Sequence, residues 1–209
     1  MRLNQNNEFF FLEALAQYTN NPKEDGEKLI QFCEYIKKSN KIYNLTSITD
    51  INDMLVKHIL DSLSIQEFLK GRDILDVGAG AGLPGIPLAI TIPKKNFLLV
   101  DSNNKKITFL NHVKMSLELK NVNLLHKRVE DLGQDSVFDT VICRSFASLR
   151  KIFVKAEKQL KKNGIIVAMK GKYPEQELKD LGKDIKHKAH IINVPGLKAE
   201  RHAIIMYKK

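Results

Sequence analysis

A glycine-rich segment and a later aspartate have the residue types and spacing of a nucleotide-cofactor site. Gly78, Gly80 and Gly82 come directly after the apolar run Ile74–Val77 and before a segment with helical periodicity. Glycines at such a strand-to-helix turn let a ligand approach the backbone without meeting a Cβ atom. Asp101 ends the next apolar run, 19 residues after Gly82. A carboxylate there can accept hydrogen bonds from both hydroxyls of a ribose.

The glycine spacing and a second carboxylate narrow the choice of cofactor. Dinucleotide-binding loops have the pattern Gly-x-Gly-x-x-Gly and hold a pyrophosphate at a helix N-terminus. Here the pattern is Gly78-x-Gly80-x-Gly82, and Asp76 lies two residues before the first glycine. The Asp76 carboxylate would repel a pyrophosphate but could receive a cationic amino group, directly or through water. S-adenosylmethionine has an ammonium group, a sulfonium and no phosphate, so electrostatics favours it over NAD.

Short apolar runs alternating with helical segments surround this loop. The predicted strands are Ile74–Val77, Phe97–Asp101, Val122–His126, Phe138–Ile142 and Ile165–Met169. The segments 104–119 and 149–162 between them have the length and periodicity of helices. This alternation predicts a parallel sheet with helical crossovers. Two further strands are predicted at 191–194 and 203–207, separated by the turn signal Pro195-Gly196.

The first 70 residues have a different pattern. Residues 8–19, 26–38 and 50–70 read as helices, and residues 40–49 read as a loop rich in Asn, Ser and Thr. We therefore expect an N-terminal helical cap over residues 1–70 on a doubly wound α/β domain over residues 71–209, the two forming one structural unit.

Composition limits the class of protein. The chain has 209 residues, of which 43% are hydrophobic and 28% charged, as in globular proteins. No apolar run approaches the roughly 18 residues of a membrane span. The two cysteines, Cys33 and Cys143, form no Cys-x-x-Cys pair, which favours a reducing cytoplasm.

The positive charge lies in one part of the chain. The net charge is +10; residues 1–149 have 18 basic and 18 acidic residues, whereas residues 150–209 have 16 and 6. Such asymmetry indicates a polyanionic partner such as nucleic acid. Solvated lysines on surface helices give the same statistics, so charge alone leaves both interpretations open.

Three weaker signals concern other chemistries. Cys143 lies near a strand end, where cytosine-C5 methyltransferases have a nucleophile, but it does not follow a proline and is interpreted as a small buried residue. His187 and His190 would point to opposite faces of a strand, so no metal site is expected. His58 and Asp61 share a helix face and could either orient the cap against the cofactor cleft or pair structurally.

Motifs along nearly the whole chain resemble one family, the bacterial 16S ribosomal RNA (guanine-N7) methyltransferases, or glucose-inhibited division protein B family. The matching segments are Asn44–Ile48, His58–Leu63, Asp76–Leu88, Asp101–Ser102, Lys105–Lys106, Phe109–Leu110, Arg128–Glu130, Arg144–Leu149, Lys170–Gly171 and Glu200–His202. The chain departs at Asn104 and Ser145, where the family more often has Gly and Ala. Neither departure falls on a cofactor residue.

The resemblance implies a Rossmann-like class I S-adenosylmethionine-dependent methyltransferase with an N-terminal helical cap. It implies methyl transfer to N7 of a guanosine in 16S rRNA near the decoding site, position 527 in the usual rRNA numbering. By the same resemblance, the cofactor contacts fall on Gly78, Leu83, Val129, Glu130 and Arg144. Asp76, Gly80 and Asp101 join them from the arguments above.

Each contact has a physical rationale. Leu83 can pack against the cofactor, and the Glu130 carboxylate, which with Val129 follows the third predicted strand, can accept from an adenine amino group. Arg144 could bind the cofactor carboxylate or an RNA phosphate, and the sequence does not choose. Lys170, Arg201 and His202 are candidates for contact with RNA. The expected partner is 16S rRNA or the small ribosomal subunit, with no membrane and no metal, and the expected enzyme is a cytoplasmic monomer.

The expected chemistry needs no general base, because guanine N7 has a free in-plane lone pair at neutral pH. No catalytic residue is therefore predicted beyond positioning by Arg144. The alternative is a non-catalytic nucleic-acid-binding protein on a methyltransferase fold, since a fold alone does not decide function.

Overall fold

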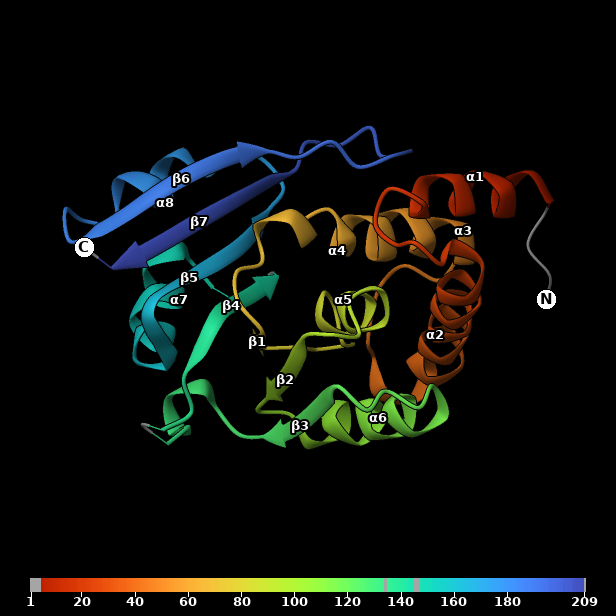
Figure 1. The fold of residues 1–209 in the computed structure, drawn as a ribbon, viewed down its shortest axis with the longest axis horizontal. Helices are drawn as coiled ribbons and strands as arrows, with labels where there is room; N and C mark the ends of the chain where they lie inside the picture. Colours follow the sequence, from red (N-terminus) through yellow and green to blue (C-terminus); the bar gives the residue numbers. More distant parts are fainter. Residues whose placement is uncertain (1–4, 134, 145–146, 209) are drawn as a thin grey trace.

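A seven-stranded sheet runs through the centre of the computed structural model, which describes residues 5–133, 135–144 and 147–208 (Figure 1). Ser145 therefore lies outside the described residues. The strands are β1 (Asp73–Val77), β2 (Asn96–Asp101), β3 (Val122–His126), β4 (Phe138–Arg144), β5 (Leu160–Lys170), β6 (Ile185–Ile191) and β7 (His202–Lys208).

The strand order is β3-β2-β1-β4-β5-β7-β6. The first five strands are parallel, whereas β7 runs antiparallel to β5 and β6 antiparallel to β7. The chain winds outward from β1 in one direction through β2 and β3, and in the other from β4 onward. The order therefore reverses between β1 and β4, and open α/β sheets bind ligands outside the carboxyl ends of strands at such a point.

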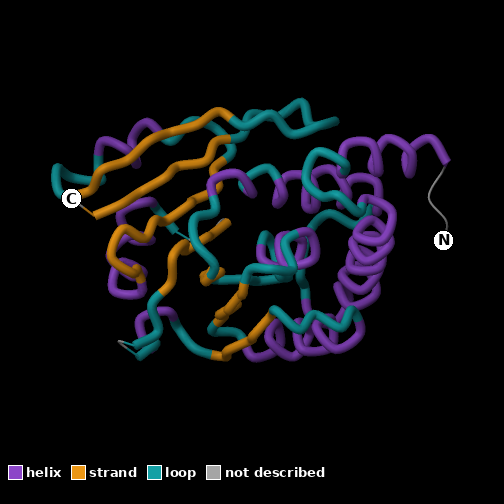
Figure 2. The backbone as a smooth tube through the Cα atoms, viewed as in Figure 1, coloured by secondary structure: helices purple, strands orange, loops and turns teal. Residues whose placement is uncertain are grey.

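Helices precede the sheet and connect its strands (Figure 2). Before β1 the chain forms α1 (Gln5–Leu15), α2 (Pro22–Tyr43), α3 (Ile51–Met54), a π-helical turn (Leu55–Leu60), α4 (Asp61–Leu63) and a 3₁₀ turn (Gln66–Phe68). The later helices are α5 (Gly85–Thr91), α6 (Asn104–Ser116), α7 (Leu149–Ala156) and α8 (Glu175–Lys179), with 3₁₀ turns at Val129–Asp131 and Glu157–Gln159.

The sheet separates two apolar cores. Successive side chains of a strand point to opposite faces, so Ile74 belongs to one core and its neighbour Leu75 to the other. Residues of α1, α2, α5 and α6 pack in the first core, and residues of α7 and α8 pack in the second. The N-terminal helices thus share one core with the sheet. The boundary at residue 70 stays a prediction.

The first long helix ends where the sequence supplies a left-handed residue. Pro22 occupies the start of α2, where its missing N–H is not needed. Asn44 follows the helix with φ of 49°, and its N–H bonds to the carbonyl of Asn40. The Asn40 side chain then accepts from the N–H groups of Leu45 and Thr46 and donates to the Thr46 carbonyl. These bonds fix the loop that brings Thr46 to His58.

The parallel strands lie where the sequence predicts them, but two later predictions are wrong. The strand expected at 191–194 is instead β6, Ile185–Ile191, whose residues pair one by one with β7. The helix expected over 149–162 ends at Ala156, because β5 begins at Leu160. The expected helix over 50–70 is divided into four short helical segments.

Among the described residues, no helix is both long and apolar enough to cross a membrane.

Candidate cofactor and substrate site

The glycine loop leaves the carboxyl end of β1 through left-handed backbone. Gly78, Gly80 and Gly82 have φ values of 68°, 58° and 89°, a region that favours glycine. The Gly78 N–H donates to the carbonyl of Val100 at 2.9 Å, which ties the loop to β2. A Cβ atom on Gly80 would be in ordinary van der Waals contact with the Gly78 carbonyl oxygen at 3.7 Å and with Nζ of Lys106 at 4.0 Å, so no atom crowds this residue. A ligand can therefore approach the loop there.

Asp101 is held against this loop by backbone donors. Its Oδ2 accepts from the Gly80 N–H at 2.9 Å, and its Oδ1 accepts from the Asn103 N–H at 2.8 Å. The residue is 7% exposed. Each carboxylate oxygen can accept more than one hydrogen bond, so both keep capacity for a hydroxyl group. The carboxylate thus has a fixed orientation at the end of β2.

A cavity of about 260 Å³ opens beside Asp101, beyond the ends of the first three strands. Its lining residues are Val77, Gly78, Val100, Asp101, Ser102, Lys106, Lys127, Arg128, Val129, Glu130 and Lys155. It brings together four predicted cofactor residues: Gly78, Asp101, Val129 and Glu130. Gly80 adjoins it through Asp101, whereas Leu83 is buried outside the lining. The placement agrees with the ligand edge of an open α/β sheet.

A salt bridge spans one side of this cavity. Lys155, from α7, contacts the Glu130 carboxylate, and the hydrogen bond from Lys155 holds the pKa of Glu130 below its ordinary value. Glu130 is therefore ionised and able to accept from an amino group. Sequence reasoning missed Lys155, because the helix that carries it is remote from the cofactor motifs in sequence. Lys106 and Arg128 lie in motifs that match the family, but the sequence indicates no role for either residue.

Asp76 is the unusual carboxylate of the site. It is fully buried, and its Oδ2 accepts from the Gly85 N–H at 2.8 Å. A Cβ on Gly85 would lie 2.5 Å from that oxygen, so glycine is required there. Oδ1 has no hydrogen-bond partner among the described residues. Burial raises the pKa of Asp76 to about 7.

An unsatisfied buried oxygen is costly, and a cationic group or a bound water would satisfy it. Because Asp76 is the second-last residue of β1, next to the glycine loop, its orphaned oxygen fits the ammonium group of S-adenosylmethionine. Asp101 fits the ribose, and the uncrowded backbone of Gly80 fits a ligand lying along the loop. The residues present therefore suit this cofactor.

Arg144, at the end of β4, lies outside the cavity lining and belongs to a second cluster. Its Nη1 lies 3.3 Å from Oδ2 of Asp61, and its Nη2 donates to Nδ1 of His58 at 2.9 Å. Arg201 donates from Nε to the other Asp61 oxygen at 2.7 Å. Asp61 is 3% exposed, so two guanidinium groups balance one buried charge. The cluster joins the helical segment before β1, the end of β4 and the start of β7.

The hydrogen bonds define the protonation of His58. Nδ1 of His58 lies 2.9 Å from Nη2 of Arg144 and 3.1 Å from the carbonyl oxygen of Lys57. A guanidinium only donates, so the shorter contact with Arg144 makes Nδ1 an acceptor that gives no proton to the Lys57 carbonyl, and Nε2–H donates to Oγ1 of Thr46 at 2.8 Å. Burial, followed by the charge of Arg144, lowers the pKa of His58 to about 4. The imidazole is neutral at pH 7. It therefore supports Arg144 rather than repelling it.

The other RNA candidates lie on the neighbouring strands. Lys170, at the end of β5, pairs with Glu177 at 2.8 Å and donates to the Ala147 carbonyl. His202 is buried, its Nδ1 lies 2.7 Å from the Gly171 carbonyl, and its ring meets that of Tyr173 edge-on. Arg201 is the more accessible member of this group. Its contact with Asp61 brings it beside Arg144.

Comparison with known proteins identifies the family. The family model GidB, described as rRNA small subunit methyltransferase G, matches residues 25–205. A protein of that name from Coxiella burnetii (strain RSA 331 / Henzerling II) is 45% identical over 178 residues, which cover 85% of this chain and 86% of the relative. One from Legionella pneumophila (strain Corby) is 44% identical over 181 residues, covering 87% and 86%. The chain belongs to the rRNA small subunit methyltransferase G family.

Solved structures agree at the level of the fold. An S-adenosylmethionine-dependent methyltransferase from Aquifex aeolicus superposes with a TM-score of 0.57 at 20% identity, covering 74% of this chain and 92% of that one. A fibrillarin from Aeropyrum pernix, crystallised with natively bound S-adenosyl-L-methionine, gives 0.53 at 15%, covering 66% and 67%. The Rossmann-like methyltransferase fold is thereby confirmed. A member of the rRNA small subunit methyltransferase G family is an S-adenosylmethionine-dependent enzyme.

Proposed function

We propose that this enzyme transfers a methyl group from S-adenosylmethionine to N7 of a guanosine in 16S rRNA, at position 527 by family resemblance. Family membership supports the small-subunit rRNA as substrate. The observation that supports N7 is the engagement of the titratable groups around Arg144. Both oxygens of Asp61 hold guanidinium groups and both ring nitrogens of His58 are hydrogen-bonded, so neither side chain is free to take a proton.

The first set of residues would hold the cofactor. Asp101 would accept from the ribose hydroxyls, Glu130 from the adenine amino group, and Asp76 would bind the ammonium group. Val129 and Leu83 would supply apolar contacts. When bound, S-adenosylmethionine supplies a methyl group on a positively charged sulfur, which a neutral lone pair can take without first losing a proton.

The second set would position the guanosine. We place Arg144 here as a positioning residue whose guanidinium meets either the cofactor carboxylate or an RNA phosphate. Asp61 and His58 fix its orientation. Preorganisation of this kind lowers the barrier by holding the reacting atoms in line, a contribution of up to about 7–11 kcal/mol. Lys170, Arg201 and His202 surround the same edge; Lys170 is paired with Glu177 and Arg201 with Asp61, so either would meet an RNA phosphate as a member of an ion pair.

We further propose that the enzyme acts in the cytoplasm as a monomer and without a metal ion. The substrate class supports the location, and among the described residues no group of three or more His, Cys, Asp or Glu side chains could hold a metal.

The test is direct mapping of the modified base. Purified enzyme is incubated with labelled S-adenosylmethionine and with 16S rRNA or small subunits from cells that lack the activity. The rRNA is then reduced and cleaved with aniline, which breaks the chain at 7-methylguanosine. We expect one cleavage, at the predicted guanosine. Label on another base or at another atom of guanine would contradict the proposal, and absence of label would favour the non-catalytic alternative.

A further inference from the structure

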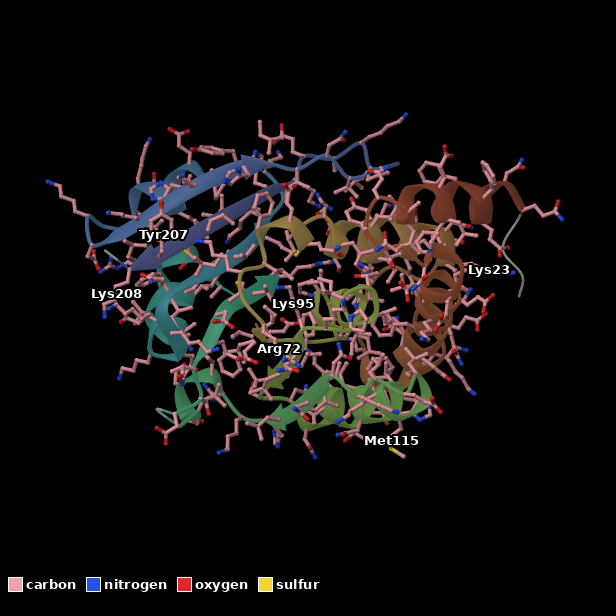
Figure 3. The ribbon with its side chains drawn as sticks, in the orientation of Figure 1. Lys23, Arg72, Lys95, Met115, Tyr207 and Lys208 are labelled. Carbon is pink, nitrogen blue, oxygen red and sulfur yellow. The ribbon has the colours of Figure 1, made fainter. Side chains whose placement is uncertain are left out.

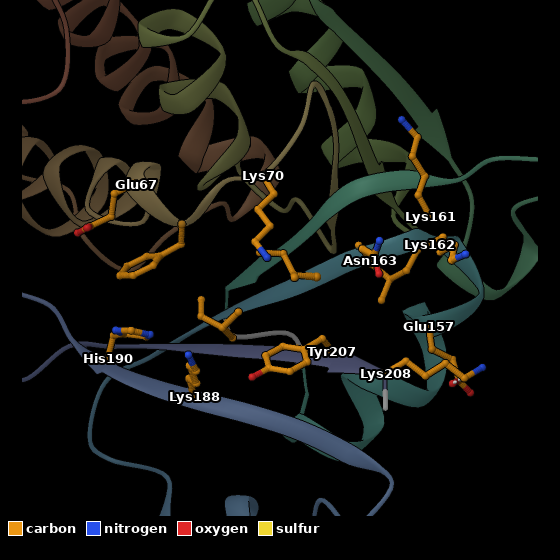
Figure 4. A pocket seen from close by; sticks show the side chains of 15 residues that line it. Glu67, Lys70, Glu157, Lys161, Lys162, Asn163, Lys188, His190, Tyr207 and Lys208 are labelled. Carbon is orange, nitrogen blue, oxygen red and sulfur yellow. Dashed lines mark ion pairs between the residues drawn. The ribbon is translucent and has the colours of Figure 1, made fainter.

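A second cavity lies beside the hairpin β6–β7, at the opposite edge of the sheet from the cofactor site; Figure 4 shows the side chains that line it. It has a volume of about 820 Å³ and is bounded by the start of β5, the hairpin β6–β7 and the segment 67–70 that precedes β1. We call it the β6 groove and define it by Lys70, Lys162, Ile165, Lys188, His190 and Tyr207. None of these residues belongs to the site described above.

The groove lies over one face of the hairpin, beside the 3₁₀ turn Gln66–Phe68 and the segment that follows it. Ile205 and Tyr207 point to the same face of β7, and Lys188 and His190 on β6 pair beside that face. The helices α7 and α8 pack in the core on the other face, with Ile204. The floor of the groove is therefore apolar and aromatic. Phe68 closes one side, its ring 4.9 Å from that of His190.

The rim of the groove is positively charged. Five lysines and two glutamates line it. Lys161 is neutralised by Asp73 and Asp139 at 2.6 and 3.1 Å, and Lys208 lies 3.9 Å from Glu157. Among the described residues, Lys70, Lys162 and Lys188 make no ion pair.

These three lysines come from three different elements. Figure 4 shows Lys70 on the segment before β1, Lys162 on β5 and Lys188 on β6, around the same opening. Lysines on an edge strand protect it from aggregation, and this explains Lys188 alone. Lys70 and Lys162 are not on the edge strand, so protection of the edge does not account for their position around the groove.

We propose that the β6 groove binds a single-stranded segment of the RNA substrate, away from the methylated base. Lysines that meet phosphates, combined with aromatic rings that meet bases, are the features of single-strand binding surfaces. Tyr207 and His190 supply the rings, and Lys70, Lys162 and Lys188 supply the charge. The groove extends from Lys162, near the amino end of β5, along β6 to His190, which pairs with Ala203 and so lies level with Met169 near the carboxyl end of β5. One RNA molecule can thus contact both edges of the sheet.

The proposal rests on the proposed RNA substrate but is tested without methylation. A fluorescent single-stranded RNA containing the target loop is titrated by anisotropy between 50 and 200 mM salt. The variant carries Lys70→Gln, Lys162→Gln and Lys188→Gln. The matched control carries Lys23→Gln, Lys38→Gln and Lys120→Gln, three exposed lysines outside the groove and without ion pairs among the described residues. Lys23 lies on α2, at the far end of the molecule from Tyr207 (Figure 3).

The expected result follows from counterion release. Each lost phosphate contact reduces the log–log salt slope by about 0.7, so three reduce it by about 2. The ratio of the wild-type RNA affinity to that of the groove variant then falls about fifteenfold as the salt concentration rises fourfold. The control keeps the wild-type slope. Both variants keep the wild-type melting temperature and affinity for S-adenosylhomocysteine, which shows that they are folded.

A second measurement locates the contact. RNA with 4-thiouridine beside the target loop is crosslinked to the wild type and digested, and we expect a peptide that contains Tyr207 or His190. The proposal is overturned if the groove variant has the same salt slope as the control, or if crosslinks are confined to the carboxyl edge of the sheet. It is also overturned if polyglutamate of equal length displaces the RNA, because this result would assign the groove to an acidic protein. Failure to methylate rRNA would overturn the proposed function and leave this binding result intact.

Discussion

Arg201 donates from Nε to Oδ1 of Asp61 at 2.7 Å and so joins residues 140 positions apart in the chain. The second Asp61 oxygen lies 3.3 Å from Arg144. One buried carboxylate therefore connects the segment before β1, the end of β4 and the start of β7. Because the Asp61 carboxylate contacts Arg144, it would help to hold the residue that we propose positions the guanosine.

Asp61→Asn should lower both stability and activity, because it removes the charge that two guanidinium groups share. Breaking a buried ion pair costs about 3–5 kcal/mol when a charge is left uncompensated. We expect a smaller loss here, about 1–3 kcal/mol, since asparagine keeps one accepting oxygen and adds no charge, although the buried Nη1 of Arg144 loses its ionic partner. Urea unfolding measures it. Asp53→Asn is the matched control: its partner Lys57 is an exposed i, i+4 neighbour, and equal losses in the two variants would refute a special role for Asp61.

Asp76 should make cofactor affinity depend on pH. Its pKa is raised to about 7, so much of it is protonated below neutral pH, whereas an ammonium ligand requires the carboxylate. We expect affinity for S-adenosylhomocysteine to rise between pH 6 and 8, by up to tenfold per unit below the pKa. Calorimetry at several pH values gives the profile. Asp76→Asn should bind weakly with a flat profile, and a wild type with a flat profile would contradict the assignment.

The same shift affects the stability of the ligand-free enzyme. The folded-state pKa is above the unfolded value of 3.8, so the folded state binds the extra proton between these two values. This contribution to the free energy of unfolding is fully present below pH 3.8 and is lost as the pH rises through about 7. Asp76→Asn should remove this decrease in the free energy of unfolding with rising pH. Urea unfolding at several pH values measures it, and Asp135→Asn, at an exposed position, is the control.

His58 acts in the opposite direction. Its pKa is lowered from 6.5 to about 4, so its contribution to stability is present above pH 6.5 and is lost as the pH falls through about 4. His58→Gln should therefore be destabilising at pH 7.5 but should lessen the acid sensitivity. Urea midpoints at pH 7.5 and 5 test this. His187→Gln, exposed on β6, should leave the difference between the two midpoints unchanged; a similar change in both variants would rule out His58 as the cause.

Asp101→Ala should weaken cofactor binding about ten- to hundredfold, because hydrogen bonds to a charged group are each worth roughly 1.5–3 kcal/mol. The variant also leaves the N–H groups of Gly80 and Asn103 without their acceptor, so the loop loosens. Calorimetry with S-adenosylhomocysteine measures the loss. Asp135→Ala provides an exposed control, and an unchanged affinity for Asp101→Ala would remove this residue from the site.

Cys143→Ala should keep most of the methylation activity. Burial raises the pKa of Cys143 to about 12, and the side chain is 1% exposed, so it is no thiolate nucleophile at neutral pH. Single-turnover rates with saturating cofactor and RNA should change little between about pH 6.5 and 8.5. A rate that rises tenfold per pH unit would instead indicate a general base, and an inactive but folded Cys143→Ala would point to cytosine-C5 chemistry.

The sequence predicts the parallel half of the sheet well because its signals are local. These signals lie within about thirty residues and comprise the strand that ends at Val77, the glycines after it and Asp101. The positive φ values of the loop require the glycines. The strand β6 was missed because its residues are mostly polar, whereas the apolar run 191–194 beside it looked more like a strand. Pairing with β7 decides the outcome, and no local pattern records that pairing.

The long-range contacts of the site were equally hidden. The sequence places Glu130 and Arg144 after strand ends and leaves the role of Asp61 open, but nothing in it indicates that Lys155 would contact Glu130. Nor does it indicate that Arg201 would share Asp61 with Arg144. Such contacts arise from the crossing of elements that are distant in sequence, and the spacing of residues in one dimension does not encode them.

The placement of β7 between β5 and β6 has a consequence for biosynthesis. As the chain leaves the ribosome, β6 emerges before the strand that must separate it from β5. It therefore has no native edge to join until residues 202–208 have been made. Pairing of β7 with β5 completes this edge of the sheet and also brings Arg201, the residue before β7, to Asp61. Translation of β7 thus completes both the sheet and the support of Arg144, so the nascent enzyme acquires this part of its site late.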